Sequence, residues 1–215
     1  MWPIGTYSRF LRKIKGQEVF ERTKKVNYFG VLFCDVRQSK SREYLLNYLD
    51  VFNQKSGKYI DFYIPGYIPL EEFYENNDPA DKIEVGEKTF IFSRKEYLDF
   101  CNRFSYDFGM DFPFSATLVL LEYRCGNFST ARKIILELEA TEDGIKSAGN
   151  LFLTIFKCAE SGAMAKTLDD LFYRLTEHER AGILTAGAKS VLNFLGIDLE
   201  PVLGQCKKIY KFRVQ

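Results

Sequence analysis

Residues 26–35 read Val-Asn-Tyr-Phe-Gly-Val-Leu-Phe-Cys-Asp, and they form the most apolar segment in the first half of the chain. The run is rich in β-branched and aromatic residues, which favours a β-strand, and it is too short to span a membrane. Its apolar residues do not alternate with polar ones, so both faces of the strand are expected to be buried, as in a sheet covered by helices. The sequence therefore predicts a central strand of an α/β sheet at 26–35.

A helix and a second strand follow this segment. The polar turn 35–42 leads into a predicted helix over about 41–54, and residues 58–64 predict the next strand, which ends at Pro65-Gly66. The helix is expected to bury one stripe of side chains, which comprises Tyr44, Leu45, Tyr48, Leu49 and Phe52. A β-α-β order predicts two parallel strands joined by a right-handed crossover. Open α/β sheets bind ligands where a strand ends and a helix begins, so the turn 35–42 is a candidate site.

The middle of the chain continues with alternating elements. A short strand is predicted at 88–92, and Ser93 with Glu96 forms a capping box for a helix over about 94–107 that Gly109 closes. The buried face of this helix is expected to comprise Tyr97, Leu98, Cys101 and Phe104. A strand at 115–123 and a hairpin turn at 124–127 follow. The period-two pattern at 133–139 predicts an antiparallel edge strand, with a helix from Ser129 as the competing interpretation.

The two ends of the chain differ from its centre. The last third predicts helices over about 142–160, from Thr167, from Thr176 to Gly196, and after Pro201. Residues 2–15 combine apolar residues at helical spacing with several bases. A helix lying on the core is the favoured interpretation there, and a membrane-surface or partner-docking arm is the alternative. The predicted organisation is a basic amphipathic N-terminal segment at 1–25, an α/β sheet domain at 26–140, and a helical extension at 141–215 packed on that domain.

The order of these elements resembles the thioredoxin-like fold over roughly residues 26–160. The resemblance implies a mixed central sheet flanked by helices, and Pro113 stands where that family places a proline before a strand. The Cys-x-x-Cys motif of the family would fall near residues 36–39, which read Val-Arg-Gln-Ser. The resemblance therefore carries no thiol redox chemistry to this chain. A flavodoxin-like or other doubly wound sheet is the alternative.

Composition limits the classes of function. The chain has 215 residues, 46% of them hydrophobic and 27% charged, with a net charge of +1, which predicts a globular protein without the basic field of a nucleic-acid binder. Its five cysteines include no Cys-x-x-Cys, and His178 is the only histidine, so we expect neither a metal site nor a cofactor. Free thiols predict a cytoplasmic protein, and no segment predicts a signal peptide or a transmembrane helix. Basic ends and an acidic stretch at 61–87 could attract each other within one chain or between subunits.

The turn 35–42 is the first candidate site. Arg37, Lys40 and Arg42 supply positive charge there, and Ser39 and Ser41 supply hydroxyl groups. Because helix N-termini favour anions, this turn could hold a phosphorylated small molecule or a nucleotide. No glycine-rich phosphate loop is present, however, so an ordinary solvated and capped helix start is the favoured interpretation.

A pair of carboxylates is the second candidate. Asp35 could act as a base or a metal ligand if Glu122 lay beside it on a neighbouring strand, because such chemistry generally needs two acids. A role for Asp35 as a hydrogen-bond acceptor in the turn is the favoured interpretation. No catalytic constellation is recognisable in the remaining residues, which leans against an enzyme.

The third candidate is the stretch 65–87, which is predicted to be a long irregular loop. Its aromatic residues Tyr67, Phe73 and Tyr74 suit a protein-binding patch, and its acidity argues against nucleic acid. The sequence thus favours a non-enzymatic binding or adaptor domain that meets a protein partner, or itself, through this loop and the helical tail. The alternative is an enzyme or sensor that binds an anionic small molecule at 35–42.

Overall fold

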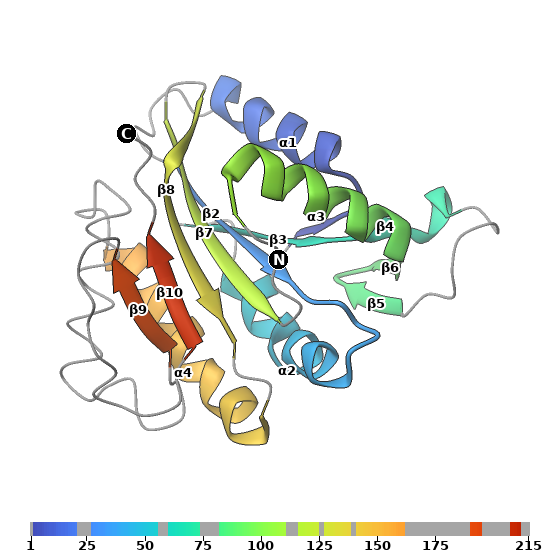
Figure 1. Ribbon diagram of the computed structural model, residues 1–215. Helices are drawn as coiled ribbons and strands as arrows, with labels where there is room; N and C mark the ends of the chain where they lie inside the picture. The colour runs from blue at the N-terminus through green and yellow to red at the C-terminus, as the bar shows by residue number, and fades with distance from the viewer. Residues whose placement is uncertain are drawn as a thin grey trace.

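The computed structural model describes residues 2–20, 27–55, 60–73, 82–110, 116–124, 127–138, 141–161, 190–194 and 207–211. Within these residues the chain forms an α/β fold with a mixed seven-stranded sheet, a three-stranded sheet and four α-helices (Figure 1). In chain order the elements are β1 (Trp2–Ile4), α1 (Tyr7–Phe20), β2 (Asn27–Phe33), α2 (Ser39–Lys55), β3 (Asp61–Pro65), β4 (Tyr67–Pro69), the 3-10 helix η1 (Leu70–Glu72), β5 (Lys82–Val85), β6 (Lys88–Phe92), α3 (Arg94–Phe108), β7 (Thr117–Arg124), β8 (Asn127–Glu137), α4 (Glu142–Ser161), β9 (Ser190–Phe194) and β10 (Lys207–Lys211).

The strand β2 lies inside the larger sheet, whose strand order is β1-β3-β2-β7-β8-β10-β9. It runs parallel to β3 on one side and antiparallel to β7 on the other. Residues on both of its faces are buried, including Val31 and Leu32, which are fully inaccessible to solvent. The predicted central strand and the parallel β-α-β unit are therefore confirmed.

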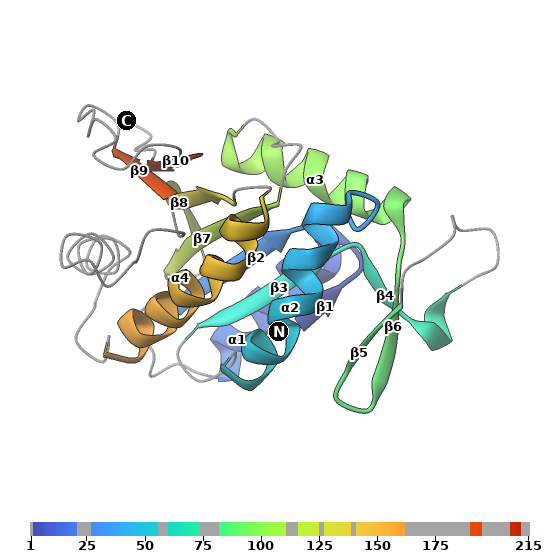
Figure 2. The ribbon, with the colours of Figure 1, turned by 90° about the horizontal axis from the view of Figure 1, so that it is seen from below.

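Among the described elements, α1 and α3 cover one face of this sheet, and α2 and α4 cover the other (Figures 1 and 2). On one face Phe33 of β2 packs against Phe104 of α3, with ring centroids 5.0 Å apart. On the other face Phe62 of β3 lies 4.7 Å from Phe52 of α2 and 5.0 Å from Phe156 of α4. The alternation of side chains along a strand sends neighbouring residues to opposite helical layers, so a run that is apolar throughout can bury both its faces.

The N-terminal segment belongs to the core. Helix α1 buries Tyr7, Phe10 and Ile14, which confirms the interpretation of this segment as a helix packed on the domain. The sequence did not predict the strand β1, which pairs in parallel with β3. Three residues are too few to show a periodic pattern, and the pairing depends on β3, about sixty positions later in the chain.

The stretch predicted as an irregular loop at 65–87 contains most of a second sheet, so that prediction is wrong in this respect. Strands β4 and β5 pair antiparallel with β6 to give the order β4-β6-β5. The chain leaves the larger sheet at Gly66, whose φ of 85° lies in the region that favours glycine. The backbone N–H of Ser93 donates to the carbonyl oxygen of Gly66 at 2.7 Å, so the chain re-enters the domain where it left.

The strand β8 corrects a further prediction. It pairs antiparallel with β7, as expected, but β10 pairs with its other side, so β8 is not an edge strand. Ile134 and Ile135 point to opposite faces and are both buried. The competing helix from Ser129 is also wrong. An edge can be recognised only when every strand that might cover it is known, and β10 lies about seventy residues further along the chain.

The C-terminal third is described in part. Helix α4 confirms the helix predicted at about 142–160. Residues 190–194, within the helix predicted from Thr176 to Gly196, and residues 207–211, in the region predicted as a helix after Pro201, form strands instead. Their valine, isoleucine and aromatic residues suit a sheet that offers them a partner. The remainder of the predicted helical extension lies outside the described residues, and so do Pro113 and the hairpin turn at 125–126.

Candidate functional site

The turn after β2 is organised by Asp35. Its side-chain Oδ1 accepts a hydrogen bond from the backbone N–H of Arg37 at 3.1 Å, and its carbonyl oxygen accepts one from the N–H of Gln38 at 2.9 Å. The carboxylate therefore stabilises the turn that starts α2, as such short acidic side chains commonly do. This confirms the favoured interpretation of Asp35 as a turn acceptor.

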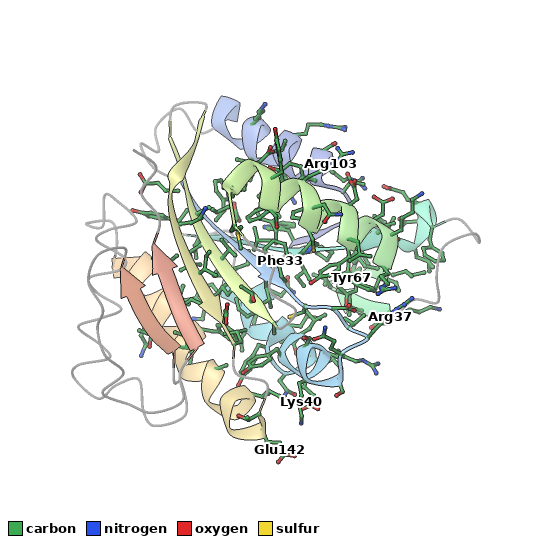
Figure 3. The ribbon with its side chains drawn as sticks, viewed as in Figure 1. Phe33, Arg37, Lys40, Tyr67, Arg103 and Glu142 are labelled. Atoms are coloured by element: carbon green, nitrogen blue, oxygen red, sulfur yellow. The ribbon has the colours of Figure 1, made fainter. Side chains whose placement is uncertain are left out.

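The anion-binding candidates around this turn do not form one site. Arg37, Ser39 and Arg42 are exposed, whereas Ser41 is buried and its hydroxyl lies 3.4 Å from Oε1 of Gln38. Lys40 pairs with Glu43 at 3.3 Å, which offsets its charge locally. Arg37 and Lys40 lie well apart around the helix start in Figure 3. These residues carry positive charge, but they do not surround one position at which a phosphate group could bind.

The second acid predicted to join Asp35 lies elsewhere. Glu122 is buried on β7 and sits opposite Tyr28, near the start of β2, whereas Asp35 follows the end of that strand. Seven residues separate Asp35 from Tyr28, which in an extended strand is roughly 20 Å. The predicted pair of carboxylates is therefore wrong, because the two acids mark opposite ends of the same strand pair.

Two thiols and a phenol lie near the end of β2. Burial raises the pKa of Cys34, and the charge of Asp35 raises it further. Burial likewise raises the pKa of Tyr97, and it raises that of Cys101 to about 12, against a hydrogen bond with Tyr97 that lowers it. Both thiols are thus held protonated at neutral pH, and a protonated thiol is a poor nucleophile and a poor metal ligand. Cys34 behaves as a small hydrophobic residue, as the sequence predicted.

Lys133 is a buried charge that the sequence did not predict. Its Nζ donates to the carbonyl oxygen of Phe108 and approaches that of Gly109 at 3.4 Å, at the C-terminal end of α3. Burial lowers the pKa of Lys133. The alternation in β8 indicated that this face was solvated, but α3 covers it. Lys133 lies 24 residues after Gly109, so the local sequence around it gives no signal of this contact.

The aromatic residues assigned to partner binding have different roles. Tyr67 is fully buried, with its ring 5.4 Å from that of Phe92, so its assignment to a binding surface is wrong. Phe73 is half-buried and follows η1, whereas Tyr74 lies outside the described residues. The burial of Tyr67 depends on Phe92, a residue that is distant in sequence but adjacent across the sheet.

The exposed residues of the strands of the second sheet lie on β5 and at the start of β6. Strand β5 exposes Lys82 and Glu84 and buries Ile83 between them, and a two-residue turn joins it to β6. Figure 2 shows this hairpin projecting from the body of the molecule. The alternation at 82–85 followed by Gly86 is a hairpin signal that the sequence contained, although the stretch was interpreted as a loop.

One ion pair ties this region to the N-terminal helix. Arg9 of α1 reaches both carboxylate oxygens of Glu72 in η1, at 2.6 and 2.8 Å, and this contact holds the pKa of Glu72 below its usual range. The pair realises, within one chain, the predicted attraction between the basic N-terminus and the acidic stretch. Both side chains are about half exposed, so the stabilisation is of the order of 1 kcal/mol or less.

Other kinds of site find no support among the described residues. No group of three or more histidine, cysteine, aspartate or glutamate side chains in that part of the chain could hold a metal ion. In the same part, the helices lack the combination of length and apolar character that crossing a membrane requires. Comparison with protein-family models, with curated proteins and with solved structures finds no match to this chain.

Proposed function

We propose that this chain is a non-enzymatic binding domain that recognises a protein partner through its second sheet. The observation that carries the proposal is the projecting β5–β6 hairpin, whose outer strand β5 pairs only with β6 in the described sheet. An outer strand presents a row of backbone donors and acceptors, which an extended segment of another chain can use.

The side chains beside the hairpin suit a protein partner. Leu70 on η1 is 44% exposed, and Phe73 after η1, Val85 on β5 and Phe90 on β6 are half-buried. Charged residues flank them, including Glu71 and Lys88. Apolar and aromatic contacts surrounded by charge are typical of protein–protein interfaces. The acidic residues of this region would repel a phosphate backbone, which disfavours a nucleic acid as the partner.

The positions of the thiols, carboxylates and basic side chains favour a binding function over a catalytic one. The buried thiols Cys34 and Cys101 carry raised pKa values, and Asp35 and Glu122 lie at opposite ends of β2 and β7. The anion-binding alternative at 35–42 keeps exposed bases but has Ser41 buried and Lys40 paired with Glu43. A helix start with these features is common without a ligand, so this alternative has less support.

The finer description of the fold is part of the same proposal. A thioredoxin-like arrangement is supported by β2, which runs parallel to β3 and antiparallel to the hairpin β7–β8, and by the helices on both faces. The second sheet is then an insertion between β3 and α3. The buried, unpaired thiols Cys34 and Cys101 agree with a reducing compartment such as the cytoplasm.

A displayed library of random peptides, selected on the purified chain, tests the proposal. Peptides are expected to bind with micromolar affinity, and Leu70→Asp should weaken that binding at least about tenfold. Leu98→Asp on α3 is the matched control, because Leu70 and Leu98 are both 44% exposed. A selection that yields no binders, or binders that lose affinity equally with Leu98→Asp, would remove the proposed surface.

A further inference from the structure

The outer edge of β5 has a defined set of backbone groups. Val85 and Lys88 flank the two-residue turn, so they form the hydrogen-bonded pair that closes the hairpin. Hydrogen-bonded and non-hydrogen-bonded pairs alternate along an antiparallel ladder, which makes Ile83 and Phe90 the next bonded pair. The N–H and C=O groups of Lys82 and Glu84 therefore point away from β6, toward the outer edge.

The charged side chains along this edge are complementary to those of the same edge in a second copy. Lys82 and Glu84 are exposed and project to the same face, two residues apart. The residues opposite them on β6 are Ile91 and Thr89, neither of which is charged. If a second β5 lay antiparallel to the first about a two-fold axis at Ile83, each Lys82 would face Glu84 of the other copy.

Backbone and side chains select the same register. In the pairing about Ile83, the outward groups of Lys82 meet those of Glu84 in the other copy, so the hydrogen bonds and the charge pairs coincide. An axis at Lys82 or at Glu84 would instead place like charges opposite each other, which is unfavourable. A slip by one residue would send the paired side chains to opposite faces of the sheet.

The described edge strand β1 shows a contrast. It is three residues long and contains Pro3, which has no backbone N–H to donate. Proline and lysine on edge strands ordinarily discourage pairing. In β5, however, the charge of Lys82 does not oppose pairing, because Glu84 of a second copy would face it.

We propose that this chain associates with a second copy of itself by antiparallel pairing of β5 with β5 about a two-fold axis at Ile83. The two small sheets then join into one continuous sheet, β4-β6-β5-β5-β6-β4. The inference rests on the proposed function, since it names the partner for the same surface. Four residues on each side make a small interface, so the association is weak and depends on concentration.

Charge-reversal variants test the proposed register. Sedimentation analysis of the full chain from about 1 µM to about 1 mM is expected to show a monomer–dimer equilibrium. Lys82→Glu and Glu84→Lys each place like charges in both pairs, so each should raise the dissociation constant of the dimer at least about tenfold. An equimolar mixture of the two variants should form a heterodimer at about the wild-type affinity, because unlike charges face each other again. Asp50→Lys on α2, also exposed and outside the second sheet, is the control for the change in net charge.

A backbone variant tests the pairing without relying on charge. Glu84→Pro removes one outward N–H but none of the donors that pair with β6, so the monomer should keep its far-ultraviolet circular dichroism and lose self-association. If Glu84→Pro fails to fold, the mixing experiment still decides the question. A monomer throughout the concentration range, or a dimer whose dissociation constant is unchanged in both charge-reversal variants, overturns the inference. Either result leaves peptide binding to Leu70 untouched, so the proposed function fails only in its own experiment.

Discussion

A buried lysine closes the C-terminal end of α3. The last carbonyl groups of a helix have no partner within the helix and carry the negative end of its dipole. Nζ of Lys133 supplies donors to the carbonyl oxygens of Phe108 and Gly109 from the neighbouring strand β8. Burial of the ammonium group costs free energy, as its lowered pKa indicates, and the hydrogen bonds to the helix end offset that cost.

Removing this side chain tests the balance between the two effects. Lys133→Ala leaves a cavity and unpaired carbonyls, and it should lower the free energy of unfolding by about 3 kcal/mol. Lys133→Met keeps most of the volume and removes the buried charge, so it should cost about 1 kcal/mol. Urea unfolding measures both values. Lys95→Ala, on the exposed face of α3, should change stability by less than about 0.5 kcal/mol. Equal losses for alanine and methionine would show that the hydrogen bonds dominate and packing contributes little.

At the level of elements, β2 can lie against β3 and α2 only because residue 30 has no side chain. A Cβ added to Gly30 would lie 2.3 Å from two ring carbons of Phe62, which is itself packed between Phe52 and Phe156. The ring therefore has no room to withdraw. Gly86, in the turn of the second sheet, differs in having open space around it and a φ of 62°.

The two glycines predict substitutions of different cost. Gly30→Ala should lower the free energy of unfolding by about 3 kcal/mol, because the overpacked ring must displace its neighbours. Gly86→Ala should cost about 1 kcal/mol, since only backbone conformation opposes it. Thermal and urea unfolding of the purified variants give the comparison. A Gly30→Ala protein as stable as Gly86→Ala would mean that β2 and β3 can move apart at little cost.

The elements predicted correctly carry their signals locally. The apolar run of β2, the stripe of α2 and the caps Ser93 and Gly109 of α3 are each contained within a few neighbouring residues. In α3, however, Leu98 was expected to face inward and is 44% exposed, because the helix buries Phe100 beside Phe104 instead. A capping signal locates the helix start but does not fix which of several apolar residues faces the core.

The errors concern contacts between distant residues. The prediction of an edge at β8 failed because β10, which covers it, is remote in the chain. Tyr67 was predicted at the surface because its neighbour Phe92, which itself packs on Tyr97, comes from a later element. The candidate site was predictable as a region, 65–87, but not as a sheet, since strands of three or four residues show too little periodicity. The carboxylate pair failed for the same reason, because strand register decides which residues meet.

For the whole molecule, several buried thiols and phenols make the free energy of unfolding fall at alkaline pH. Burial raises the pKa values of Cys34, Cys101, Tyr97 and Tyr7, and for Tyr7 a 2.6 Å hydrogen bond to Asp107 adds to the effect. In the unfolded chain the thiols and phenols titrate near 9.0 and 10.0. The folded state thus retains protons that the unfolded state releases. The stability from these groups is complete below pH 9 and is lost as the pH rises above it.

The free energy of unfolding should therefore fall by about 3 kcal/mol between about pH 8.5 and about pH 10.5. The lowered pKa values of Lys13 and Lys133 act in the opposite direction, because there the unfolded state holds more protons, so they reduce the fall. Urea titrations at stepped pH measure the slope. Cys101→Ala should make the fall smaller by about 1 kcal/mol. A stability that stays level to pH 10.5 would contradict the burial of these groups.

The hydrogen bond between Ser93 and Gly66 has a consequence for how such a molecule can diversify. Because residues 66 and 93, which bound the second sheet, lie side by side, a change in the length of the chain between them should place no strain on β3 or α3. Loops and strands there can be exchanged, trimmed or extended while the remaining framework keeps its geometry. Sequence changes within the second sheet are therefore expected to leave the larger sheet and its helices in place.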